Sequence, residues 1–138
     1  MRIADCEFIL DCGLRIYQIN MNSEEIKQRT KKFSLRIIKL IETLPKTKIT
    51  DVIGKQLLRS ATSVGANYRS ACRSRSRADF VSKICIVEEE ADESAYWLEL
   101  LLDSVIVNNH EASSLLKEAK ELTAIFTASG RTAKRGSG

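Results

Sequence analysis

The sequence has a single histidine, His110, and this scarcity excludes most catalytic and metal-binding chemistry. A serine or cysteine nucleophile needs a base to activate it, and a ferritin-like metal site needs histidines from two helices. His110 lies in VNNHEAS, between two predicted helices, where a turn or capping role is the ordinary interpretation. The row of carboxylates formed by Glu88, Asp92, Glu99 and Asp103 therefore predicts a charged helix face. We expect no catalytic residue and no metal site.

Other signatures of cofactor, zinc or membrane binding are also missing. The four cysteines (Cys6, Cys12, Cys72 and Cys85) contain no CxxC pair, which is typical of reduced thiols in a cytoplasmic protein. The segments GKQLL and GANYRSA lack the glycine spacing of a phosphate-binding loop, so we expect no cofactor. The apolar patch near the start is interrupted by acidic residues and has no basic region before it, so we expect neither a signal peptide nor a membrane span.

Glycine, proline and aromatic residues are few, and apolar residues recur every three or four positions. With 138 residues, 43% hydrophobic and 29% charged, the chain is the size of one helix-rich domain. The spacing predicts four amphipathic helices, at about 22–44, 50–73, 77–107 and 111–129. Short connections favour antiparallel neighbours, so we predict an all-α, up-down-up-down four-helix bundle over 22–130. Residues 1–21 lack this pattern and are interpreted as an extension; 131–138 are predicted to be a basic flexible tail.

The helix limits rest on local signals. Asn22 is a candidate N-cap with Glu25 three residues later, and Pro45 should end the first helix. The core stripe of the third helix is predicted to run from Phe80 through Leu98 to Val105, with these members: Phe80, Ile84, Val87, Ala91, Ala95, Leu98, Leu102 and Val105.

Charge is distributed unevenly, although the net charge is only +4. Residues 22–58 carry nine basic and four acidic groups, and 59–83 carry six and one. Residues 84–110 carry seven carboxylates and no lysine or arginine. The molecule should therefore present separate basic and acidic surfaces.

The back of the second helix is the strongest candidate for a nucleic-acid site. Basic and small residues alternate there at helical spacing, so a phosphate backbone could approach closely. The candidates on this face are Lys55, Arg59, Arg69 and Arg73, and Arg75 and Arg77 extend the charge into the following turn. The alternative is a solvated face, or arginines paired with carboxylates of the third helix in the same or a neighbouring subunit.

The third helix carries apolar residues outside its main core stripe. These are Tyr96, Trp97, Leu100 and Leu101. A helix that is apolar on more than one side often contacts another subunit, so we predict an oligomer interface here; an unusually wide intramolecular core is the alternative.

Three segments resemble the 23S rRNA intervening-sequence proteins, a family of four-helix bundles. They are TKKFSLRIIKLIETLPKTK, IGKQLLRSATSVGANYRSACRSRSRADFVSKICIVEEEADESAYWLELL and LLKEAKELTAIFTAS, within about 22–135. The resemblance implies a cytoplasmic bacterial protein, a ring-like homopentamer and no established enzymatic activity. Similar proteins are accessory factors of diversity-generating retroelements, which implies a reverse transcriptase and nucleic acid as possible partners. The matching basic residues are Arg59, Arg69, Arg73, Arg75 and Arg77, with Lys83 as an outlying candidate.

Two hypotheses follow for function. The first is a non-enzymatic oligomer that binds RNA or DNA through phosphate contacts. The second is a structural adaptor that binds a protein partner, such as a reverse transcriptase, with incidental nucleic-acid contact.

Overall fold

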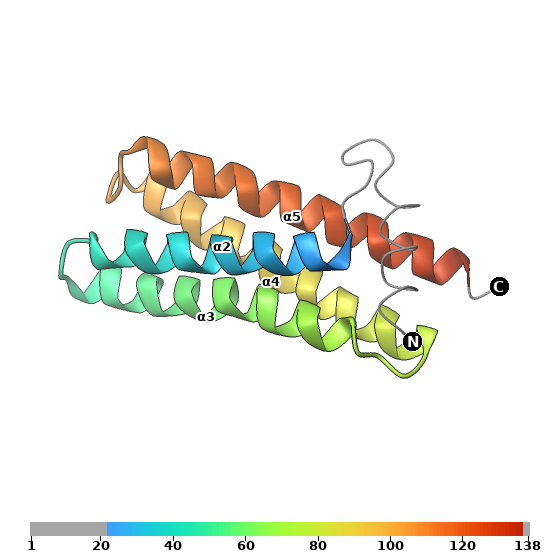
Figure 1. Ribbon diagram of the computed structural model, residues 1–138. Helices are drawn as coiled ribbons and strands as arrows, with labels where there is room; N and C mark the ends of the chain where they lie inside the picture. Colours follow the sequence, from blue (N-terminus) through green and yellow to red (C-terminus); the bar gives the residue numbers. More distant parts are fainter. Residues whose placement is uncertain (1–21, 137–138) are drawn as a thin grey trace.

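The computed structural model describes residues 22–136, which form four α-helices in one bundle. These are α2 (Ser23–Glu42), α3 (Lys48–Ala71), α4 (Arg77–Asp103) and α5 (His110–Arg135). Consecutive helices run antiparallel and lie side by side (Figure 1). The predicted all-α four-helix architecture is confirmed for this part of the chain, which contains no strand.

Each helix begins at a side-chain cap. Asn22 accepts a hydrogen bond from the Glu25 backbone N–H, and the Glu25 carboxylate accepts one from the Asn22 N–H, as predicted. Thr47, Ser76 and Asn109 cap the other three helices in the same way, each accepting from a backbone N–H three residues on. These caps satisfy N–H groups that have no partner within their own helix.

The helices are joined by unequal contacts. α4 packs against both α3 and α5, while α2 lies diagonally opposite α4 and packs mainly on α3. On its other side α2 forms ion pairs with α5. The Arg29 Nη2 atom lies 2.6 Å from a carboxylate oxygen of Glu118 and 2.6 Å from one of Glu121. The pKa of Arg29 is raised, chiefly by its hydrogen bond to Glu118. Part of the positive charge of the N-terminal half is thus balanced inside the molecule.

Hydrogen bonds between small polar residues and a close approach at a glycine join α3 to its two neighbouring helices. The buried Ser60 and Ser94 hydroxyls are 3.0 Å apart between α3 and α4. Between α2 and α3, the Ser34 hydroxyl donates to the Ala61 carbonyl at 3.1 Å, and Gly65 lies beside Thr30. A Cβ atom at position 65 would be 3.2 Å from Thr30 Oγ1, so glycine permits this approach.

The end of the fourth helix differs from the prediction. Instead of stopping near Gly130, α5 continues to Arg135, and Gly130 and Ala133 are buried. Gly130 therefore lies inside the helix beside α4, where an added Cβ atom would be 3.4 Å from Ile84, and it does not end the helix. The expected flexible tail is wrong for 131–135, which are helical, and 137–138 lie outside the described residues.

The third helix ends earlier than predicted, at Asp103 and not near Val107. Val105 has a φ of 60°, a left-handed conformation that is unusual for a β-branched residue. Its N–H bonds to the Leu102 carbonyl at 3.1 Å, and the Val107 N–H bonds to Leu101 at 3.2 Å, which closes the helix end. Val105 is consequently 72% exposed and lies outside the core, contrary to its predicted place in the stripe.

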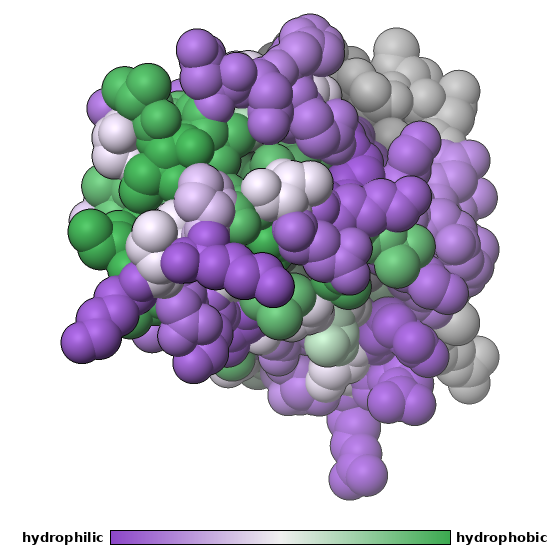
Figure 2. All heavy atoms as spheres, turned by 90° about the vertical axis from the view of Figure 1, so that its left-hand side faces the viewer, coloured by the Kyte–Doolittle hydropathy of each residue, from purple (hydrophilic) through white to green (hydrophobic). Residues whose placement is uncertain are grey.

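Apolar side chains gather at the end of the bundle that carries the 43–47 and 104–109 connections. Figure 2 views the molecule from this end and shows a group of hydrophobic atoms among polar ones. Three exposed large apolar residues, Ile49, Val52 and Val105, lie in or next to these two connections.

Candidate nucleic-acid interface

Two of the six predicted basic residues are held by carboxylates. Lys55 pairs with Asp51 at 3.0 Å, one turn back along α3. Arg59 reaches across to α4, where it pairs with Glu90 at 3.1 Å and with Glu93. The pKa of the Arg59 guanidinium is raised, first by its hydrogen bond to Glu90. Arg59 is therefore paired with carboxylates of the third predicted helix, which was the alternative to a nucleic-acid contact, and the pairing lies within one subunit.

Arg69 lies farther along α3 and Arg73 lies in the turn that follows this helix, and both are exposed. Within residues 22–136 neither forms an ion pair, so both can meet a partner's charge. Arg69 stands on the rim of a groove of 520 Å³ between α2 and α3. Lys27 and Lys31 line the same groove from α2. These two lysines, which the sequence pattern did not single out, extend the basic surface onto a second helix.

Arg75 and Arg77 lie at the turn from α3 to α4. Arg75 is exposed, and its backbone N–H donates to the Asp79 carboxylate at 3.3 Å. The pKa of Asp79 is lowered, mainly by this hydrogen bond and to a smaller extent by the one from Lys83. Lys83 pairs with Asp79 at 3.2 Å, so the outlying candidate is occupied by a local carboxylate.

The C-terminal turn of α5 joins this end of the bundle. The Arg77 guanidinium lies against Gly136, so a Cβ atom at position 136 would displace the arginine side chain. Three exposed basic residues, Arg131, Lys134 and Arg135, thus come to the same end as Arg73, Arg75 and Arg77. We call these six residues the basic end. Sequence reasoning missed the α5 members because it assigned them to a flexible tail, although their spacing continues the helix.

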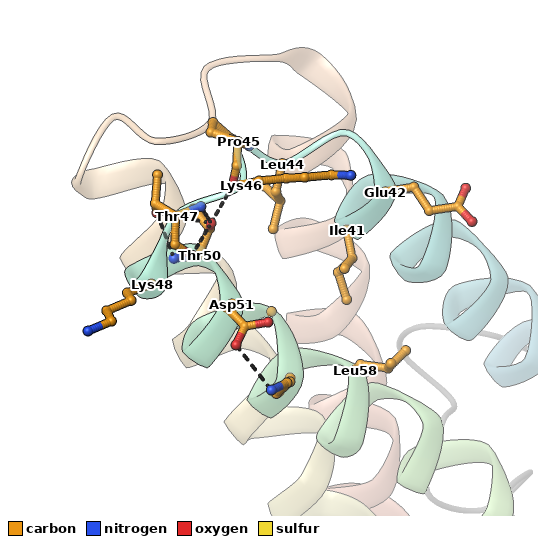
Figure 3. A pocket seen from close by; sticks show the side chains of 12 residues that line it. Ile41, Glu42, Leu44, Pro45, Lys46, Thr47, Lys48, Thr50, Asp51 and Leu58 are labelled. Atoms are coloured by element: carbon orange, nitrogen blue, oxygen red, sulfur yellow. Dashed lines mark hydrogen bonds and ion pairs between the residues drawn. The ribbon is translucent and has the colours of Figure 1, made fainter.

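Another hollow lies at the α2–α3 connection, with a volume of 690 Å³. In Figure 3 Glu42 and Lys48 point away from it to opposite sides, and Thr50 bonds to the Pro45 carbonyl. Asp51 there is paired with Lys55. The side chains of this hollow therefore stabilise the turn, and we assign no ligand to it.

Within residues 22–136 no group of three or more histidine, cysteine or acidic side chains is placed to hold a metal ion. His110 is the first residue of α5, beside the cap Asn109. None of the described helices combines the length and apolar character needed to cross a bilayer.

The predicted oligomer residues separate into two groups. Tyr96 is 52% exposed, and its ring meets that of Trp97 at a centroid distance of 5.1 Å. Trp97 and Leu100 are half-buried, and Trp97 Nε1 donates to Glu93 at 3.3 Å. Leu101, however, is completely buried in the core, so its assignment to an exposed interface is wrong. The core stripe shifts around α4 towards its end and passes through Leu101, leaving the predicted core residue Leu102 half-buried.

The fold and surface together define a small all-α bundle with a basic end. Residues 22–128 match the family described as 23S rRNA-intervening sequence protein. The chain belongs to this family, which confirms the resemblance. No curated protein matches the chain.

A solved structure supports the same fold. It is the crystal structure of a protein with unknown function from the S23 ribosomal protein family of Bacteroides thetaiotaomicron VPI-5482. It is 34% identical, with a TM-score of 0.73, over 80% of this chain and 99% of that one.

Proposed function

We propose that the protein is a non-enzymatic, cytoplasmic homo-oligomer that binds RNA or DNA through its basic end. The observation that carries the proposal is the difference in charge pairing along the predicted basic face. Lys55 and Arg59 are paired, whereas Arg73 and Arg75 are exposed and have no ion pair among the described residues. Unpaired arginines can replace the counterions of a phosphate backbone.

The chemistry favours weak sequence selectivity. Arginine forms bidentate hydrogen bonds with phosphate, and phosphate contacts carry no direct sequence information. The basic end draws on two helices and the turn between α3 and α4, which suits a backbone that passes across the bundle end. A ring-like homopentamer, implied by the family resemblance, would repeat this end around the assembly.

Salt dependence of binding tests the proposal directly. The full chain and an Arg73→Gln/Arg75→Gln variant would be titrated with a labelled single-stranded RNA and a duplex DNA at several salt concentrations. Losing two phosphate contacts should flatten the log affinity against log salt slope by about 1.4 for the single strand and about 1.8 for the duplex. The matched control is Lys39→Gln/Lys117→Gln, which removes the same charge from exposed positions elsewhere.

A slope that is unchanged in the arginine variant, or equally reduced in the control, would remove the basic end from the site. Incubation of the protein with labelled rRNA fragments and Mg²⁺ should leave the fragments intact. Reproducible cleavage that is abolished by Glu89→Gln would overturn the non-enzymatic part.

The second candidate is an adaptor that binds a protein partner, such as a reverse transcriptase. It is favoured by Arg59, whose charge is used between α3 and α4 and not for a ligand. The adaptor is supported if protein freed of co-purifying nucleic acid shifts neither RNA nor DNA at low salt.

A further inference from the structure

The outer side of α4 forms a regular ridge that faces away from the core. Its residues alternate in steps of three and four, the spacing of a helix surface that packs on a partner. They are Ile86, Glu89, Glu93, Tyr96, Leu100 and Asp103. Ile86 is 42% exposed and Tyr96 52%, so two large apolar side chains stand in solvent along one line.

The ridge is strongly acidic. Glu89 and Asp103 on the ridge and Asp92 beside it are exposed, and none of the three forms an ion pair within residues 22–136. No lysine or arginine occurs between positions 84 and 110, so the part of α4 that carries the ridge supplies no positive charge of its own. The exposed Tyr96 therefore stands among carboxylates, with Asp92 one turn before it.

The groove between α2 and α3 has the complementary character. Gly65 and Ala66 line it with small residues, and Leu35, which is 51% exposed, lines it from α2. Lys27, Lys31 and Arg69 supply three positive charges against one lining carboxylate, Glu24, which binds Gln28 at 3.2 Å. Farther along, Ile38 and Leu58 continue the exposed apolar surface.

Within one molecule the ridge touches α3 through the Glu93–Arg59 pair and does not reach the α2 wall of the groove. Ile84, Leu98 and Leu101 are buried in the core and fix the inner side of α4, so the ridge points outward. α4 is also diagonal to α2, which forms one wall of the groove. An α4 ridge that reaches Lys27 and Lys31 must therefore come from another molecule.

We propose that the α4 ridge of one copy of this chain docks in the α2–α3 groove of the next, with Tyr96 over Gly65 and Ala66 and the ridge carboxylates facing Lys27, Lys31 and Arg69. Because the two surfaces differ, the contact is heterologous and generates a ring or an open chain, not a two-fold dimer. The inference rests on the homo-oligomer of the proposed function and is independent of nucleic-acid binding at the basic end.

Charge reversal and its repair test the contact. Light scattering after size-exclusion chromatography would compare the full chain, Lys27→Glu/Lys31→Glu, Glu89→Lys/Asp92→Lys, and the variant that combines all four changes. Each double variant places like charges opposite each other and should raise the dissociation constant of the oligomer about tenfold or more. The fourfold variant restores opposite charges and should recover most of the assembly, which a merely structural effect of either double change would not.

Two further variants complete the experiment. Lys39→Glu/Lys117→Glu, the matched control, reverses two exposed charges outside both surfaces and should leave the oligomer unchanged. Tyr96→Ala should dissociate the oligomer while circular dichroism shows an intact helical bundle.

Different outcomes of this experiment refute different parts of the proposal. If the wild-type chain is still monomeric at about 100 μM, in the range of dissociation constants for weak association, both the oligomer and this contact are refuted. The salt-slope test of the basic end is not affected by that result. A wild-type oligomer that resists both double variants, or a fourfold variant that stays dissociated, would overturn the ridge and groove alone. Loss of RNA binding with an unchanged oligomer in Lys27→Glu/Lys31→Glu would assign the groove to nucleic acid and equally refute the contact.

Discussion

Replacing Leu101 by alanine should destabilise the folded subunit more than the same replacement at Leu102. Leu101 has no exposed surface, whereas Leu102 is only partly buried against the core. Leucine to alanine removes three carbon atoms from the interior. At about 0.8 kcal/mol for each buried CH₂, the transfer loss at Leu101 is about 2.4 kcal/mol.

An unfilled cavity adds to that loss, so the expected range for Leu101→Ala is about 2–5 kcal/mol. Leu102 retains contact with solvent, and Leu102→Ala should cost at least about 1 kcal/mol less, in proportion to its smaller burial. The shift in melting temperature for Leu101→Ala should be roughly 10 °C or more for a domain of this size.

Urea unfolding followed by circular dichroism, together with light scattering, would measure both variants. An unchanged urea slope is required for a comparison of free energies of unfolding. The reasoning is refuted if Leu102→Ala costs as much as Leu101→Ala. It is also refuted if Leu101→Ala dissociates an oligomer without lowering the stability of the subunit, since Leu101 would then be an interface residue.

Three other predictions concern single features. Trp97→Ala should weaken subunit association by about 2 kcal/mol or more, because a large aromatic side chain commonly carries a disproportionate share of interface energy. Light scattering at micromolar concentration should show dissociation, with helical content largely kept. An unchanged oligomer with reduced thermal stability would place Trp97 in the intramolecular core. Val105→Gly should raise the free energy of unfolding by up to about 1 kcal/mol, because glycine adopts the φ of 60° without strain and the valine it replaces is mostly exposed; a lower midpoint in urea would contradict this. Stability should fall as the pH drops from about 5 to about 3, because the pKa of Glu111 is lowered by its hydrogen bond from Arg36 and that of Asp79 by the Arg75 backbone N–H. A carboxylate with a depressed folded-state pKa stabilises the fold above its unfolded pKa, and this stabilisation is lost as the pH falls through the folded-state pKa. An Arg36→Gln variant should therefore lose less stability over this pH range. A loss equal to that of the wild type would exclude Glu111 as a source of the pH dependence.

Helix formation in this chain depends on signals that are close together in the sequence. The Asn22 and Glu25 pair predicted the start of α2, because both members of a capping box lie within one turn. Apolar residues at steps of three and four predicted four helices, because that spacing places them on one side of a helix. The family was likewise recognisable from the sequence, whose matching segments lie within the helical part.

Contacts between distant residues decided the rest. Gly130 reads as a helix end, yet α5 continues to Arg135 and Gly130 lies buried beside Ile84 of α4. Leu101 and Leu102 are indistinguishable by composition, and only the way α4 packs on its neighbours determines which of them is buried.

The same distinction governs the candidate site. Sequence spacing grouped Arg59 with Arg73, but Arg59 meets carboxylates of α4 that lie about thirty positions away, at Glu90 and Glu93. The basic end likewise depends on the packing of α5 on α4, which brings the last turn of α5 beside the α3–α4 turn, with Arg77 against Gly136. The sequence thus determined which residues are charged and which face of its helix each occupies, since helical geometry is local. Which of those charges are paired and which are free was decided by the tertiary structure, because electrostatic pairing depends on distances between helices.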